Sequence, residues 1–140
     1  MKRETDVFDD IEGMVLAEAR KLFSEKVIDH FSRPRNLGEN KEAQCFACMS
    51  GMCGDTVGIY VNLDGDTISQ VNFVTDGCGP TIACGSALTC MAKGLPVGEA
   101  MKLKGADLIA YLDGLPRENT HCADLAVNTL RGALEKAEVD

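Results

Sequence analysis

The sequence has no long apolar run and no excess of basic residues, and both absences restrict what the protein can be. No stretch approaches the roughly 18 consecutive apolar residues that identify a membrane-spanning helix. The N-terminus, MKRETDVFDDIEG, lacks the apolar segment of a secretory signal peptide. With 14 basic against 22 acidic residues, no basic face is expected to bind nucleic acid. We therefore expect a cytoplasmic protein without membrane or nucleic-acid partners, whose partners are proteins or metal ions.

Internal repeats, low-complexity tracts and linkers are also missing, and 140 residues suit one domain with a real core. Residues 1–22 are interpreted as an N-terminal helical extension and residues 23–140 as the domain itself. Apolar residues four positions apart predict one continuous helical stripe through Ile11, Val15, Ala19, Phe23, Val27 and Phe31. The helix-breaking residues Pro34, Asn36 and Gly38 end this helical pattern.

Two neighbouring segments, TVGIYVNL (56–63) and TISQVNFV (67–74), are rich in β-branched and aromatic residues. In the first of them apolar residues alternate with others, which is the period of a half-buried strand. Asp64 and Gly65 lie between the segments and predict a hairpin turn. The preceding segment AQCFACMS predicts a third, shorter strand.

The C-terminal half has helical patterns. PTIACGSALTCMAK (80–93) places Pro80 at a first helical position. VGEAMKLKG and GADLIAYLDG predict two short helices bounded by glycine, and HCADLAVNTLRGALEKAE (121–138) has a clear apolar face. Strands followed by helices predict an α+β fold, in which helices pack on one face of an antiparallel sheet of about three strands.

The seven cysteines are an odd number, so they cannot all pair with one another. In a reducing compartment, clustered cysteines favour metal binding or redox chemistry over disulfides. The alternative is that they are small buried hydrophobic residues. We expect that alternative to hold for some of the seven and not for all.

Three cysteines lie at the predicted ends of elements: Cys53 before a strand, Cys78 between a strand and a helix, and Cys122 at the start of the last helix. The positive end of a helix dipole favours the thiolate, which binds metals and sulfur. Glycines beside Cys53 and Cys78 leave room for a bulky ligand. A shared metal site requires these thiols to converge through the fold, and the spacing alone leaves that open.

The segments FSEKVIDHFSRPRNLGE (23–39), CGD (53–55), DGCG (76–79) and HC (121–122), in this order and spacing, resemble the IscU/NifU-type iron–sulfur cluster assembly scaffolds. The resemblance extends from residue 23 to about residue 137. It implies an α+β scaffold of the NifU N-terminal type that is not an enzyme. It also implies that Cys53, Cys78 and Cys122 hold a labile [2Fe–2S] cluster, with Asp55 or His121 as a weaker ligand.

By the same resemblance, a cysteine desulfurase supplies sulfur to one thiol, for which Cys122 is the candidate, and iron joins to build the cluster. Apo-proteins then receive the cluster. A carboxylate oxygen is a poorer match than thiolate for a sulfide-bridged iron centre, so it holds the cluster loosely enough for release. The acceptors, a [4Fe–4S] form and the choice between a monomer and a homodimer stay open.

The chain departs from this family in two places. Family members often carry a Leu-Pro-Pro-Val-Lys segment read by an Hsp70-type chaperone, whereas residues 115–119 here are LPREN, which argues against that partner. Four further thiols match no family ligand: Cys45, Cys48, Cys84 and Cys90. A strand would turn Cys45 and Cys48 to opposite faces, and Cys84 and Cys90 are expected to be buried.

Two other functions use the same residues. Tetrahedral Zn²⁺ accepts cysteine, histidine and aspartate, so the site could hold zinc as a working metal or as a substitute in isolated protein. A thiol–disulfide oxidoreductase would use the C-x-x-C pair Cys45 and Cys48, although such motifs usually open a helix. His30 is interpreted as a packing or solvated residue.

Overall fold

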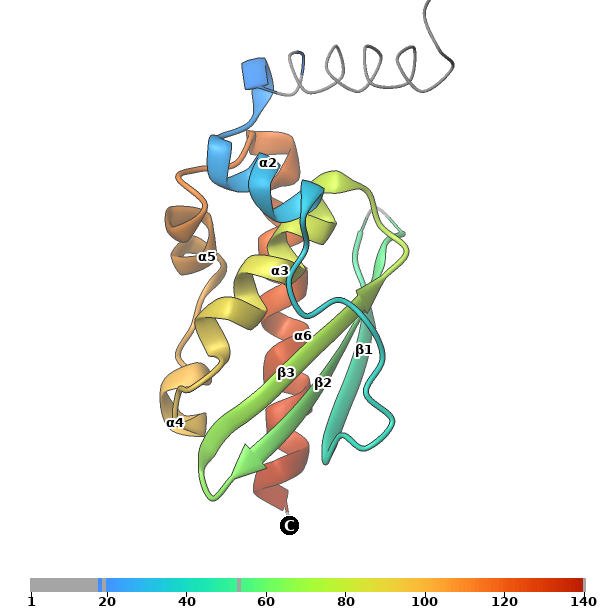
Figure 1. Ribbon diagram of the computed structural model, residues 1–140, viewed down its shortest axis with the longest axis vertical. Coiled ribbons are helices and arrows are strands. Elements are labelled where there is room, and N and C mark those ends of the chain that lie inside the picture. Colours follow the sequence, from blue (N-terminus) through green and yellow to red (C-terminus); the bar gives the residue numbers. More distant parts are fainter. Residues whose placement is uncertain (1–17, 19, 53, 140) are drawn as a thin grey trace, which may run out of the picture.

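The computed structural model describes residue 18, residues 20–52 and residues 54–139. Three antiparallel strands form one sheet in the order β1-β2-β3: β1 is Cys45–Ser50, β2 is Thr56–Asp64 and β3 is Thr67–Thr75 (Figure 1). The predicted hairpin is present, but its two-residue turn lies at Gly65 and Asp66, one residue later than predicted, because Asp64 ends β2. Gly65 adopts a φ of 65°, which a glycine reaches without strain.

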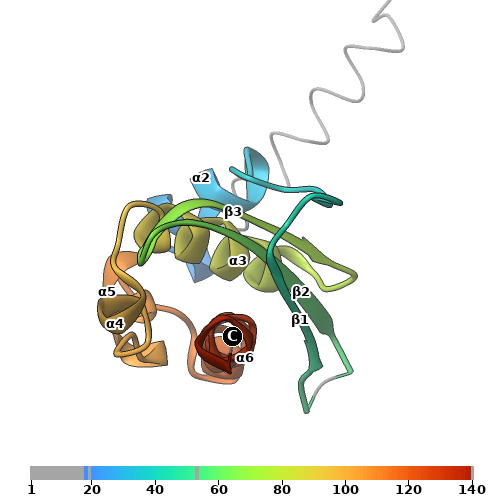
Figure 2. The ribbon, with the colours of Figure 1, turned by 90° about the horizontal axis from the view of Figure 1, so that it is seen from below.

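One face of the sheet is apolar because alternate side chains point to it. Its members are Cys45, Ala47, Val57, Ile59, Val61, Val71 and Phe73, all of them buried. Two long helices cover this face: α3 (Gly79–Ala92) packs on β3, and α6 (Thr120–Val139) packs on β1 and β2. Figure 2 shows α6 lying within the curve of the sheet. The predicted α+β fold is therefore confirmed.

The shorter helices complete the helical layer. Helix α2 (Glu25–Ser32) packs on α3, and α5 (Gly105–Tyr111) packs on α6. Helix α4 (Val97–Ala100) and the 3-10 helix η1 (Arg117–Asn119) lie in the connections. Within the described part of the chain, no helix combines the length and apolarity that crossing a bilayer requires.

The continuous helical stripe through Phe23, Val27 and Phe31 is wrong within the described residues. Ser24 has extended backbone angles and its hydroxyl accepts a hydrogen bond from the Val27 amide at 3.1 Å, so it caps a new helix. The rest of the stripe, Ile11, Val15 and Ala19, lies outside the described residues, as does most of the predicted extension 1–22.

Two helix boundaries also differ from the sequence prediction. Helix α3 begins at Gly79, one residue before Pro80, with Cys78 in the capping position. Helix α4 is a single turn that ends at Ala100, because residues 101–104 form a turn and an extended connection rather than continuing to Gly105.

Candidate functional site

Apart from Cys53, which lies outside the described residues, the predicted site residues belong to three segments at the upper end of the domain in Figure 1. These segments are the loop before β2, the loop after β3, and the first turn of α6, with the first turn of α3 next to them. Each segment is an element end carried by a packed sheet or helix, so the rigid scaffold fixes where the loops lie.

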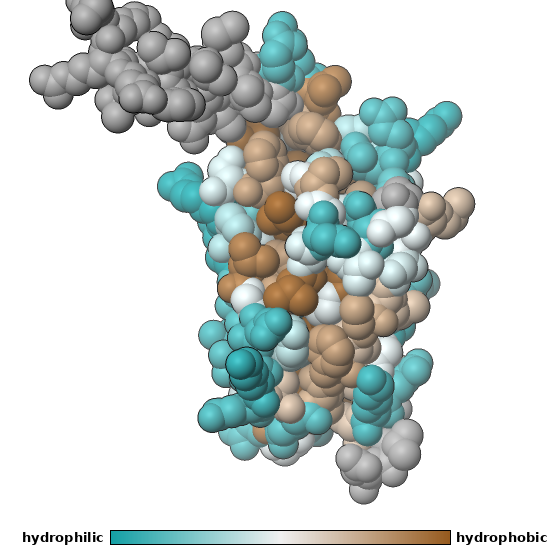
Figure 3. All heavy atoms as spheres, turned by 90° about the vertical axis from the view of Figure 1, so that its right-hand side faces the viewer, coloured by the Kyte–Doolittle hydropathy of each residue, from teal (hydrophilic) through white to brown (hydrophobic). Residues whose placement is uncertain are grey.

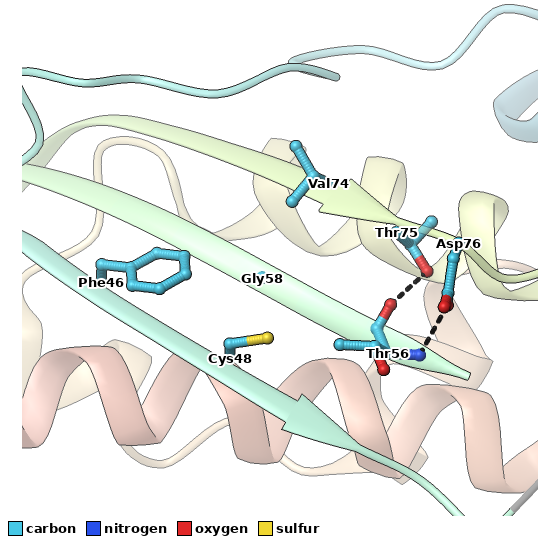
Figure 4. Close-up of a pocket in the computed structure, with 7 residues that line it drawn as sticks. All are labelled: Phe46, Cys48, Thr56, Gly58, Val74, Thr75 and Asp76. Carbon is cyan, nitrogen blue, oxygen red and sulfur yellow. Dashed lines mark hydrogen bonds between the residues drawn. The ribbon is translucent and has the colours of Figure 1, made fainter. Parts of the chain in front are cut away.

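Hydrogen bonds fasten the first two loops to each other. The Thr56 amide donates to Asp76 Oδ1 at 2.8 Å, and the Thr75 hydroxyl donates to the Thr56 carbonyl at 2.7 Å (Figure 4). Thr56 directly follows Asp55, and Asp76 lies two residues before Cys78. The loop that carries Cys78 is therefore held against the loop that carries Asp55.

A chain of side-chain contacts joins Asp55 to the start of α6. The Thr81 hydroxyl donates to Asp55 Oδ2 at 2.8 Å and lies 3.4 Å from the sulfur of Cys122. His121 Nε2 lies 3.7 Å from the same sulfur. The fold thus links Asp55, through Thr81, to the adjacent pair His121 and Cys122, which is far from Asp55 in the sequence.

Gly77 makes this close packing feasible because it has no Cβ atom. A Cβ built there would lie 2.7 Å from Thr81 Cβ and 2.9 Å from Asp55 Oδ2. Both distances are shorter than real Cβ contacts, so a side chain at this position would displace one of the two groups. Gly79, on the other side of Cys78, would meet only ordinary contacts with Phe31 at 3.6 Å or more.

The three predicted cluster cysteines differ in what the structure describes. Cys53 lies outside the described residues. Cys78 is exposed at the N-cap of α3, whereas Cys122 is only 2% exposed in the first turn of α6. Among residue 18, residues 20–52 and residues 54–139, no three histidine, cysteine, aspartate or glutamate side chains are grouped to hold a metal ion. The site residues therefore remain predictions.

The sequence analysis missed Thr81. The signal that could have found it is its position three residues after Cys78, in the first turn of α3, where i and i+3 side chains share a helix face. The 1% exposure of Thr81 also distinguishes it from a solvent-facing threonine.

Three of the four cysteines without a family counterpart, Cys45, Cys48 and Cys84, are placed as the sequence predicts. Cys45 is buried and Cys48 is exposed, so β1 does turn them to opposite faces. Cys84 is buried, and burial, with a smaller contribution from Cys122, raises the pKa of its thiol. Cys90 is only partly buried, so the expectation that it is buried is wrong.

His30 has a packing role, as the sequence interpretation allows. It is 6% exposed, and its Nδ1 lies 2.7 Å from the Ser86 hydroxyl of α3. Burial lowers the pKa of His30, which favours the neutral ring. This histidine therefore helps to join α2 to α3 and is not part of the candidate site.

Two shallow hollows flank the site. One borders His121 and is lined by Met49, Met52 and Leu125 among others. The other lies on the uncovered face of the sheet between Phe46, Cys48 and neighbouring residues (Figure 4). The face seen in Figure 3 has hydrophobic residues at its centre and hydrophilic ones above and below.

The model of the family described as "NifU-like N terminal domain" matches residues 22–138. The chain belongs to this family. The NifU-like match covers the elements from α2 to α6, apart from the last residue of α6, and includes every predicted site residue. It therefore agrees with the resemblance found in the sequence segments.

Curated relatives of this NifU-like chain have consistent names. "Iron-sulfur cluster assembly scaffold protein IscU" of Aquifex aeolicus is 41% identical over 116 residues, covering 81% of this chain and 74% of the relative. "Iron-sulfur cluster assembly scaffold protein IscU 1" of Archaeoglobus fulgidus is 38% identical over 114 residues, with the same two coverages. The scaffold protein IscU of Escherichia coli K12 is 36% identical over 117 residues, covering 80% and 91%.

Solved structures support the NifU-like fold. A cluster assembly scaffold protein for a SUF system from Fervidobacterium islandicum AW-1 has a TM-score of 0.69 at 23% identity, covering 80% of this chain and 96% of that one. The N-terminal part of a NifU-like protein from Brucella abortus has a TM-score of 0.67 at 12% identity, covering 84% and 94%. At these identities the likeness concerns the fold alone.

Proposed function

We propose that this protein is a non-enzymatic scaffold on which an iron–sulfur cluster is assembled. One observation carries the proposal: Asp55 and Cys122, predicted ligands from distant parts of the chain, lie on either side of the Thr81 hydroxyl. The names of its NifU-like relatives as cluster assembly scaffolds agree with it. The cluster is then cargo that the protein builds and releases.

The residues fit this cargo. Thiolates are the usual ligands of iron–sulfur clusters, and we assign Cys53, Cys78 and Cys122 to a [2Fe–2S] cluster, with Asp55 or His121 completing the set. The missing Cβ at Gly77 lets Thr81 and Asp55 pack directly against the loop that carries Cys78. A hard carboxylate oxygen binds a sulfide-bridged iron centre less well than thiolate does, which suits a cluster that is handed on.

Sulfur would come from a cysteine desulfurase. The Cys122 thiolate attacks the terminal sulfur of the donor's persulfide, so the S–S bond of the donor breaks, a new S–S bond forms on Cys122, and the donor leaves as a thiolate. Because Cys122 is only 2% exposed, this step requires the first turn of α6 to open. Iron and electrons then complete the cluster, and apo-proteins accept it.

Anaerobic reconstitution tests the function. The protein is incubated with ferrous iron, cysteine and a desulfurase, and then mixed with an apo-ferredoxin. We expect visible charge-transfer bands, acid-labile sulfide, and transfer that activates the ferredoxin. A colourless protein that contains only zinc, or one that assembles no sulfide, would refute the proposal. Reduction of insulin disulfides through Cys45 and Cys48 would instead indicate an oxidoreductase.

A further inference from the structure

We propose that Thr81 is a positioning residue of this site, whose hydroxyl sets the spacing of Asp55 and Cys122 before the cargo arrives. The inference rests on the proposed function, because it concerns two of the assigned ligands. Thr81 is 1% exposed in the first turn of α3, between the loop before β2 and the first turn of α6. Its hydroxyl therefore contacts one predicted ligand in each of these two segments, Asp55 and Cys122.

The hydrogen-bond directions follow from the number of protons. A threonine hydroxyl carries one proton, and Thr81 donates it to Asp55 Oδ2 at 2.8 Å. At 3.4 Å from Cys122 Sγ, the Thr81 oxygen is left to accept from the thiol. A single oxygen atom thus fixes the carboxylate and the sulfur relative to each other.

Packing holds this hydroxyl in place. The Cβ and Cγ2 atoms of Thr81 lie 2.7 and 2.8 Å from the position that a Cβ of Gly77 would occupy, so the glycine backbone lies directly against the side chain. A threonine also has few χ1 rotamers in a helix. Valine in this place would fill nearly the same volume without either hydrogen bond, whereas serine would keep the hydroxyl.

The test measures affinity for Co²⁺ in the anaerobic apo-protein, through the sulfur-to-cobalt charge-transfer band. Loss of a hydrogen-bond partner of a ligand lowers metal affinity by roughly 10- to 100-fold, and we expect a loss in that range for Thr81→Val. Thr81→Ser should restore affinity close to that of the parent. If Thr81→Val does not fold, Thr81→Ala removes the same hydroxyl and takes its place.

Thr129→Val is the matched control. Thr129 is a fully buried threonine of α6 whose hydroxyl donates to the Leu125 carbonyl of its own helix at 2.7 Å. Its replacement removes a buried hydroxyl of the same kind without touching Asp55 or Cys122. We expect Thr129→Val to leave Co²⁺ affinity unchanged, even where it lowers the thermal stability.

A double-mutant cycle separates positioning from a general structural role. If Thr81 acts through Asp55, Thr81→Val should weaken Co²⁺ binding much less in an Asp55→Ala background than in the parent. Strictly additive losses, or parent-like binding by Thr81→Val, would overturn the proposal while leaving cluster assembly by the parent intact. A parent protein that neither binds Co²⁺ nor assembles a cluster would overturn the site, and the role of Thr81 with it.

Discussion

The glycines on either side of Cys78 give a pair of substitutions with different expected costs. In Gly77→Ala the new methyl group would lie 2.7 Å from Thr81 Cβ and 2.9 Å from Asp55 Oδ2, which forces one of them to move. Overpacking of this kind costs about 1–3 kcal/mol of unfolding free energy. In Gly79→Ala the nearest atom lies at 3.6 Å, so the new methyl group meets only ordinary contacts and causes no overpacking.

Urea unfolding followed by far-UV circular dichroism measures both variants, since the chain has no tryptophan to serve as a fluorescent probe. We expect Gly77→Ala to be less stable than Gly79→Ala by roughly 1–3 kcal/mol, and to bind Co²⁺ more weakly because Asp55 or Thr81 is displaced. Equal stability of the two variants, together with parent-like Co²⁺ affinity in Gly77→Ala, would refute the close packing around Asp55.

Three further predictions concern single side chains. Asp55→Ala should slow loss of the cluster to an acceptor, because the weak oxygen ligand is removed; equal or faster release counts against a labilising Asp55. Burial raises the pKa of Cys84, so the folded protein keeps a proton that the unfolded chain loses above about pH 8.5, and stability falls as pH rises past that value. Cys84→Ala should make this fall shallower in urea unfolding between pH 8 and 9.5, and an unchanged slope contradicts it. Burial lowers the pKa of His30, so stability should be lost as pH falls below about 6.5, where the unfolded chain takes up the proton first. His30→Gln should reduce that loss between pH 7 and 5.5, and a loss as large as that of the parent would contradict this effect of burial.

The sheet was predictable from the sequence because strand signals there are local. Alternation in 56–63, the Asp64-Gly65 pair and β-branched residues in 67–74 together specify the hairpin, and the structure has it. The break at Ser24 was not predicted, because a spacing of four residues is kept across a helix cap. The extended backbone of Ser24 and the hydrogen bond from the Val27 amide to its hydroxyl mark the start of a new helix.

The site was predictable in part for a similar reason. Cysteines at element ends and the pairs around them are visible in the sequence, and Cys78 and Cys122 do lie at the starts of α3 and α6. The packing of β2, α3 and α6 decides which side chain links Asp55 to Cys122. No local sequence pattern shows how close these three elements lie to one another. Thr81 therefore required the three-dimensional structure.

The claim that three cysteines hold the cluster is tested most directly by substituting the thiols one at a time. Each variant is reconstituted anaerobically, and its iron, acid-labile sulfide and optical spectrum are measured. We expect Cys53→Ser, Cys78→Ser and Cys122→Ser to lose the cluster or shift its charge-transfer bands, while Cys48→Ser and Cys90→Ser match the parent. A full complement of iron and sulfide with an unchanged spectrum in Cys78→Ser or Cys122→Ser would contradict the account.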